Sequence, residues 1–220
     1  MKDATHMAVL LDRSGSMGSV KDETISGFNY FLKEQKAAGD NATFTLVQFD
    51  SESTDVVHEA RPIRDVPDLN QDTYLPRGST PLLDALGQTI ISTGKTLAGI
   101  PEPNRPDKVV FVVITDGEEN ASHQFTKARV KEMIEHQTAK YNWKFIYLGA
   151  NQDAFAEARS VGIAMATAAN YAPAYTDMVY ASTSANVARY RQSGRSEALR
   201  YSEEQRKRMV KPEDKDGKEN

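Results

Sequence analysis

The chain has 220 residues, with 27 basic and 31 acidic side chains, a net charge of −4 and no cysteine. This length suits one α/β domain with a full core and a short extension. The slightly acidic balance gives no electrostatic reason to expect nucleic acid or an anionic membrane as a partner. Without cysteine the chain has no disulfides, thiolate zinc sites or cysteine nucleophiles, so any metal must be bound by oxygen or histidine.

Five segments predict the strands of a sheet. Four are apolar runs without polar alternation, which is typical of strands buried on both faces, and they cover residues 6–12, 44–50, 108–116 and 144–150. The fifth, residues 54–63, alternates more and predicts an antiparallel edge strand. We therefore expect a mostly parallel sheet with one antiparallel edge.

Helical patterns separate and follow these runs, at residues 19–38, 81–97, 126–140, 153–160 and 175–192. Their position between strands predicts crossover helices that cover the sheet. The expected fold class is α/β, with a doubly wound, mostly parallel sheet, helices on both faces and one antiparallel edge strand.

The end of the chain differs in composition. From residue 193 onward, 15 of 28 residues are charged, and the last ten, KPEDKDGKEN, include no large apolar side chain. Such a segment buries too little apolar surface to offset its ordering entropy. We predict a domain over residues 1–192 and a charged, largely disordered tail over residues 193–220, with a short helix near residues 197–209 as an alternative for part of it.

Polar residues gather where two of the apolar runs end. The first run leads into Asp-Arg-Ser-Gly-Ser-Met-Gly at residues 12–18, and the run 108–116 leads into Gly-Glu-Glu. A third segment, Arg-Gly-Ser-Thr-Pro at residues 77–81, precedes a predicted helix. In a doubly wound sheet, ligands bind outside the carboxyl ends of the strands. The sequence therefore predicts that these three segments form one site.

The three segments, read as DRSGS, GSTPLLDAL and ITDGEEN, resemble in content and order the metal-ion-dependent adhesion site of von Willebrand factor A domains. The resemblance is to stand-alone domains of bacterial or phage type and covers about residues 5–192. It implies the same fold and hydroxyl ligands from Ser14, Ser16 and Thr80. It also implies that Asp12 and Asp116 bond to metal-bound water or to the metal itself. Thr80 would bind the metal only in the state of the domain that can bind its partner.

This set of side chains suits a hard divalent cation. Mg²⁺ takes about six oxygen ligands and keeps several waters, so three neutral hydroxyls with outer carboxylates leave coordination positions open. The cation then stays electrophilic and can accept a carboxylate. We therefore expect the site to bind Mg²⁺, with Mn²⁺ or Ca²⁺ as alternatives. The expected function is that of a cytoplasmic, non-enzymatic module that binds an Asp or Glu side chain of a protein partner. Nucleic acid and membranes are not expected as partners.

Three other functions remain as alternatives. A haloacid-dehalogenase-type phosphatase also places a first-strand aspartate near Mg²⁺, but it needs a second aspartate as general acid, where this chain has Ser14. A serine hydrolase needs Gly-x-Ser-x-Gly, and the first glycine is absent. The third alternative is a scaffold in which the metal is only structural.

Several other polar residues receive no ligand role. The histidines His6, His58, His123 and His136 show no spacing typical of a metal site. Asp and Ser after a strand can also serve as helix caps, and Ser79 or Thr80 could cap the helix that follows Pro81. Glu118 and Glu119 are expected to lie in a solvated loop.

Overall fold

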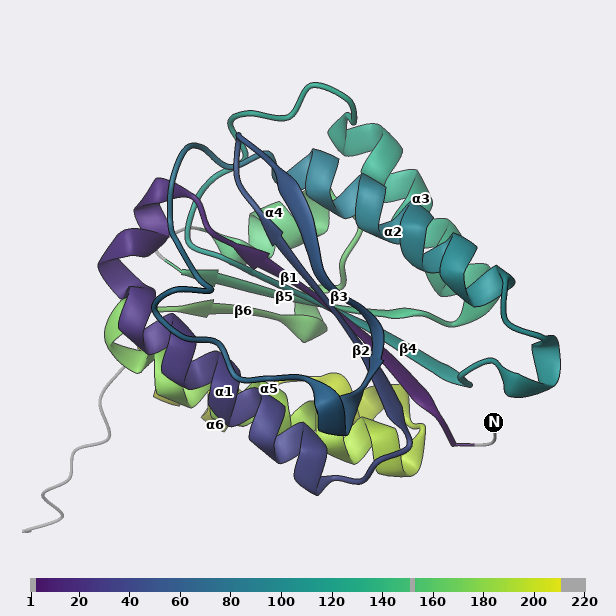
Figure 1. Cartoon of the computed structure of the whole chain (residues 1–220). Helices are drawn as coiled ribbons and strands as arrows, with labels where there is room; N and C mark the ends of the chain where they lie inside the picture. Colours follow the sequence, from purple (N-terminus) through teal and green to yellow (C-terminus); the bar gives the residue numbers. More distant parts are fainter. Residues whose placement is uncertain (1–2, 151–152, 211–220) are drawn as a thin grey trace, which may run out of the picture.

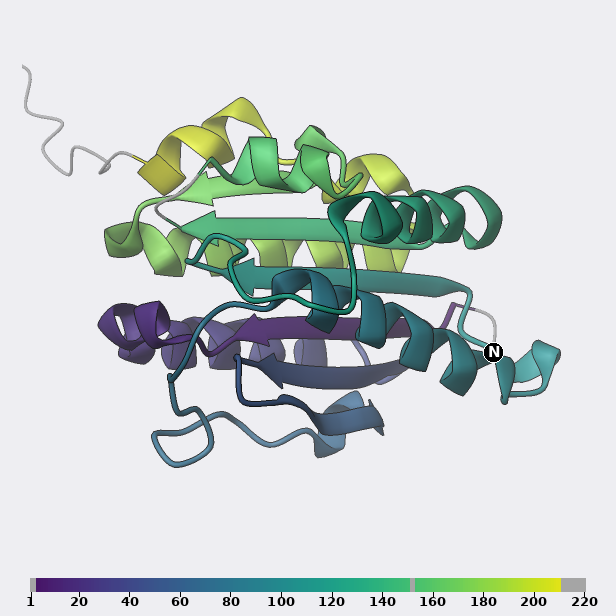
Figure 2. The ribbon, with the colours of Figure 1, turned by 90° about the horizontal axis from the view of Figure 1, so that it is seen from above.

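A six-stranded sheet forms the centre of the molecule in the computed structural model, which describes residues 3–150 and 153–210 (Figure 1). The strands lie side by side in the order β3-β2-β1-β4-β5-β6 (Figure 2). Their bounds are Thr5–Asp12 (β1), Ala42–Phe49 (β2), Thr54–Pro62 (β3), Lys108–Thr115 (β4), Lys144–Ala150 (β5) and Ala168–Tyr171 (β6).

The pairing pattern confirms the expected fold class. β3 pairs antiparallel with β2 at one edge, and the other neighbours pair in parallel. β1 and β4 are buried at every position, as expected for strands covered on both faces. The sequence did not predict β6, because its four residues, Ala-Ala-Asn-Tyr, form no apolar run.

Helices cover both faces of the sheet (Figure 1). They are Lys21–Ala37 (α1), Leu82–Ala98 (α2), Lys127–Tyr141 (α3), Ala154–Ser160 (α4), Thr176–Ser193 (α5) and Glu203–Val210 (α6). Alternate residues of β1 point to opposite faces: Met7 and Val9 join the core beneath α1, α5 and α6, whereas Ala8 and Leu10 join the core beneath α2, α3 and α4. No helix among the described residues is long and apolar enough to cross a bilayer.

The domain extends further than the sequence predicted. Beyond residue 193 the chain forms a 3-10 helix, Ser196–Leu199, and then α6. Leu199, Tyr201 and Met209 are buried in the same core as α1 and α5. The structure shows residues 193–210 to be ordered, so the expected disorder does not hold there and the alternative of a short helix near residues 197–209 is met by α6, because a few well-placed apolar anchors outweigh the high charge. The rest of the predicted tail, residues 211–220, lies outside the described residues.

The chain order of the strands places a topological switch point between β1 and β4. The connection after β1 leads to β2 on one side, whereas β4 pairs on the other side of β1. Because β1 and β4 are parallel, with Leu11 opposite Ile114, Asp12 lies beside Thr115 at their carboxyl ends. This is the switch point at which open α/β sheets bind their ligands.

Candidate metal centre

Asp12, the last residue of β1, is fully buried and held by two hydrogen bonds. Its Oδ1 accepts the backbone N–H of Ser14 at 2.7 Å, and its Oδ2 accepts the Thr115 hydroxyl at 2.6 Å. Tyr74 donates to the Asp12 carbonyl oxygen at 2.6 Å. Burial raises the pKa of Asp12 to about 6, although the hydrogen bonds from Thr115 and Ser14 oppose this rise. A nearby cation would favour the charged carboxylate.

Ser14, Ser16 and Asp116 form a continuous row of oxygen atoms. The two serine Oγ atoms lie 3.0 Å apart, and Ser16 Oγ donates to Asp116 Oδ1 at 2.7 Å. Burial raises the pKa of Asp116 above its ordinary value, and the hydrogen bond from Ser16 opposes this rise. The structure therefore brings together the two sequence segments that carry these residues, which are 100 positions apart.

Thr80 faces the same row across Gly117. A Cβ atom on Gly117 would lie 2.7 Å from Thr80 Oγ1, 3.4 Å from Ser16 Oγ and 3.7 Å from Ser14 Oγ. Only a residue without a side chain leaves this space open to the three hydroxyls. Thr80 is buried, and its backbone N–H donates to Asn120 Oδ1 at 2.9 Å. The three predicted hydroxyls thus face Gly117 and Asp116 directly precedes it, whereas Asp12 is linked to Gly117 through the Thr115 hydroxyl, which donates to Asp12 Oδ2 and accepts the Gly117 N–H.

Glu119 differs from its prediction as part of a solvated loop. Its Oε2 accepts the Leu83 N–H of α2 at 2.9 Å and the Ser122 hydroxyl at 2.7 Å. Asp84 reaches back from α2 and accepts three successive backbone N–H groups of the same loop, those of His123, Gln124 and Phe125. Neither Ser79 nor Thr80 caps this helix through its side chain. Glu119 instead satisfies an unpaired N–H of the first turn and ties the loop after β4 to α2.

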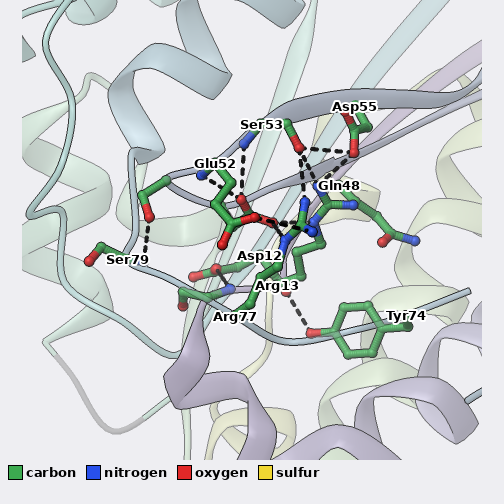
Figure 3. Close-up of polar contacts among 12 residues, drawn as sticks. Asp12, Arg13, Gln48, Glu52, Ser53, Asp55, Tyr74, Arg77 and Ser79 are labelled. Atoms are coloured by element: carbon green, nitrogen blue, oxygen red, sulfur yellow. Dashed lines mark hydrogen bonds and ion pairs between the residues drawn. The ribbon is translucent and has the colours of Figure 1, made fainter. Parts of the chain in front are cut away.

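An ion-pair network lies beside the centre (Figure 3). Arg13, between Asp12 and Ser14, turns its side chain toward β2 and β3, where it donates to Asp50 at 2.5 Å and to Asp55 at 2.6 Å. Arg77 donates to the same oxygen of Asp50 at 3.0 Å. Nothing in the sequence pattern predicted this network, because its charged residues come from four separate segments.

The oxygen atoms present suit an octahedral cation. Neighbouring ligands of an octahedron with bonds of about 2.0–2.1 Å lie about 3 Å apart, and Ser14 Oγ and Ser16 Oγ have this separation. Across residues 3–150 and 153–210, no three His, Asp or Glu side chains form a group that could hold a metal. A cation at this position would therefore depend on the serine and threonine hydroxyls as well as on the carboxylates, a set of hard oxygen donors.

No family model and no curated protein matches the chain by sequence. Solved structures do match. A von Willebrand factor type A protein from Catenulispora acidiphila has a TM-score of 0.56 and 16% identity, covering 83% of this chain and 42% of its own. Proximal thread matrix protein 1 from the mussel byssus, with a zinc-occupied MIDAS motif, has a TM-score of 0.57 and 17% identity, covering 81% and 46%. The SpRpn10 VWA domain has a TM-score of 0.50 and 9% identity, covering 77% and 87%.

These likenesses show a shared fold. The chain has the architecture of a von Willebrand factor A domain, as the resemblance of its motifs implied. It spans less than half the length of the Catenulispora and mussel proteins. Activities and partners of those longer proteins therefore do not transfer to it directly.

Proposed function

We propose that this chain, which has the fold of von Willebrand factor A domains, is a protein-binding module that depends on a divalent cation. The observation that carries the proposal is the convergence of Ser14, Ser16, Thr80 and Asp116 on the space beside Gly117. The zinc-occupied MIDAS motif of the mussel protein supports a divalent site in this fold. The proposed ion is Mg²⁺, with Mn²⁺ or Ca²⁺ as alternatives.

Each residue has a defined part in this proposal. Ser14, Ser16 and Thr80 would offer neutral oxygen ligands to the cation. Asp12 and Asp116 would contribute negative charge, through metal-bound water or at the metal itself. When bound, the cation supplies an electrophilic point that attracts a carboxylate, because its neutral ligands leave its charge poorly compensated. Ser16 and Glu118 are exposed, so the centre opens toward solvent on the side where a partner would approach.

The proposed partner is a protein that presents an Asp or Glu side chain to this open side. The module is proposed to act by binding alone, without catalysis. Ser14 supports this, since it occupies the position at which a Mg²⁺-dependent phosphatase of comparable motif carries its general acid. A cytoplasmic location, expected from the sequence, belongs to the same proposal.

Capture of a partner from an extract of the native host, in Mg²⁺ or in EDTA, tests this function. We expect the full chain to retain a partner in Mg²⁺ and to release it in EDTA. The Asp12→Ala variant, checked by circular dichroism to be folded, should capture nothing in either buffer. A partner retained in EDTA, or by the variant in Mg²⁺, would instead favour a scaffold whose metal is structural.

A further inference from the structure

The turn between β2 and β3, residues 50–53, contacts both loops of the candidate metal centre. Toward the first loop, residues 12–16, Asp50 and Ser53 accept hydrogen bonds from the Arg13 side chain at 2.5 and 2.7 Å. Toward the second loop, residues 77–80, Asp50 accepts from Arg77. The turn therefore bridges the segments that carry the serine hydroxyls and the Thr80 hydroxyl.

Asp50 is the centre of this bridge. Its side chain is fully buried, and Oδ2 accepts hydrogen bonds from both Arg13 Nε and Arg77 Nε. Its other oxygen, Oδ1, accepts the backbone N–H groups of Glu52 and Ser53 at 2.7 and 3.0 Å. Burial alone would raise the pKa of Asp50, but the two arginines and these amides outweigh it and hold the pKa below its ordinary value. Asp50 is thus a fixed negative charge shared by the side chains of Arg13 and Arg77.

Backbone hydrogen bonds also join the two loops to each other and to the turn. Arg77 N–H donates to the Arg13 carbonyl at 2.8 Å, and Gly15 N–H donates to the Gly78 carbonyl at 2.9 Å. Ser51 Oγ accepts the Ser79 N–H at 2.9 Å, directly before Thr80. Gly78 has a φ of +66°, and a Cβ on it would collide with Ser51 Oγ. The second loop therefore lies tightly between the turn and the first loop.

We propose that Asp50 is a positioning residue for the metal centre, which through Arg13 and Arg77 sets the distance between the serine hydroxyls and the Thr80 hydroxyl. The inference rests on the proposed function, since it concerns the affinity of the same site. Among the described residues, Asp50 forms no hydrogen bond or ion pair with a proposed ligand side chain. It acts on the cation through the two arginines and the turn, as outer residues that orient metal ligands do in other proteins.

Titration of the full chain with Mn²⁺ alone, followed by electron paramagnetic resonance of the free ion, tests this role. Outer residues that orient ligands change metal affinity by about 10–100-fold, and we expect Asp50→Asn to weaken Mn²⁺ binding by at least the lower figure. Arg77→Gln should have a similar effect, because it cuts the same link from the other end. Arg77 is 44% exposed, so this second variant leaves the buried core intact. The double variant should lose little more than either single variant.

Asp55→Asn is the matched control. Asp55 also pairs with Arg13, but it is half-exposed, and within the described part of the chain it forms no ion pair with Arg77. Its Mn²⁺ affinity should fall by much less than the loss of about 10-fold expected for the bridge variants, because both arginines remain bonded to Asp50 when Asp55 is changed. Equal losses of Mn²⁺ affinity in Asp55→Asn and Asp50→Asn would refute the positioning role of Asp50.

The outcomes separate the inference from the function on which it rests. If the wild type binds Mn²⁺ and Asp12→Ala does not, but Asp50→Asn and Arg77→Gln bind as the wild type does, the positioning role is refuted and the proposed function stands. A purely structural role for Asp50 would lower the urea midpoint without changing the affinity of the folded protein, and it would give the same refutation. If the wild type itself binds no Mn²⁺, the proposed function and the inference both fail.

Discussion

Replacement of Gly117 by alanine would place a methyl group among the three hydroxyls of the candidate centre. The new Cβ would lie 2.7 Å from Thr80 Oγ1, well inside ordinary van der Waals contact, and 3.4 Å from Ser16 Oγ. The backbone at Gly117 does not have a positive φ, so alanine meets no conformational strain of that kind there. The methyl group therefore acts on the site itself, by displacing Thr80 and occupying space next to the serine oxygens.

The magnitude follows from linkage. A ligand at about 100 times its dissociation constant stabilises the folded state by about 2.7 kcal/mol. For a chain of this size, that corresponds to a rise in the thermal midpoint of roughly 5–10 °C. We expect Mg²⁺ to produce this rise in the wild type and almost none in Gly117→Ala, as measured by differential scanning calorimetry with and without EDTA.

Gly94→Ala is a suitable control for this experiment. Gly94 lies within α2, and the nearest atom to an added Cβ would be a Trp143 ring carbon at 4.0 Å. Alanine should raise basal stability by about 0.5–1 kcal/mol because it lowers the entropy cost of the helix, and the response to Mg²⁺ should be unchanged. A full response to Mg²⁺ in Gly117→Ala would refute the position assigned to the cation.

Two further predictions concern stability away from the centre. Met209→Ala should lower the free energy of unfolding, measured in urea, by about 2–5 kcal/mol because a fully buried side chain is lost. Val210 is 49% exposed, so Val210→Ala should change this free energy by less than about 0.5 kcal/mol. Equal effects of the two substitutions would show that α6 is not packed against the core. Burial lowers the pKa of His6 to about 4 in the folded chain, against an ordinary value of 6.5. Between these two pH values His6 is protonated in the unfolded chain but not in the folded one, so the folded state loses stability as the pH falls. We expect His6 to contribute a loss of about 2–3 kcal/mol at pH 4.5, and a His6→Gln variant with the same stability difference between pH 7 and 4.5 as the wild type would contradict it.

The sequence predicted the sheet and the main helices because their signals are local. Continuous apolar runs distinguish β1, β2, β4 and β5, and the more polar, alternating segment marks β3 as the exposed edge. The five candidate site residues could be proposed because their segments follow a strand or precede a helix and resemble the adhesion-site motifs of von Willebrand factor A domains. Parallel topology then brings such positions together at one edge of the sheet.

Other features depend on contacts that no local pattern encodes. α6 packs through single apolar residues such as Met209 within a charged segment, so composition alone predicts disorder. The cap of Glu119 on α2 joins residues 36 positions apart, and the pair Arg13–Asp50 joins residues 37 apart. Glu and Arg are usually solvated, and only the fold shows that these side chains hold the loops of the centre in place.

Isothermal titration calorimetry of Mg²⁺ into the metal-free full chain and into its Asp12→Ala variant tests the central claim most directly. We expect one site per chain in the wild type and no saturable binding in the variant, because Asp12 supplies buried negative charge behind the hydroxyl ligands. Equal binding by both proteins, or no binding by the wild type, would contradict the assignment of this edge of the sheet as a divalent-cation site.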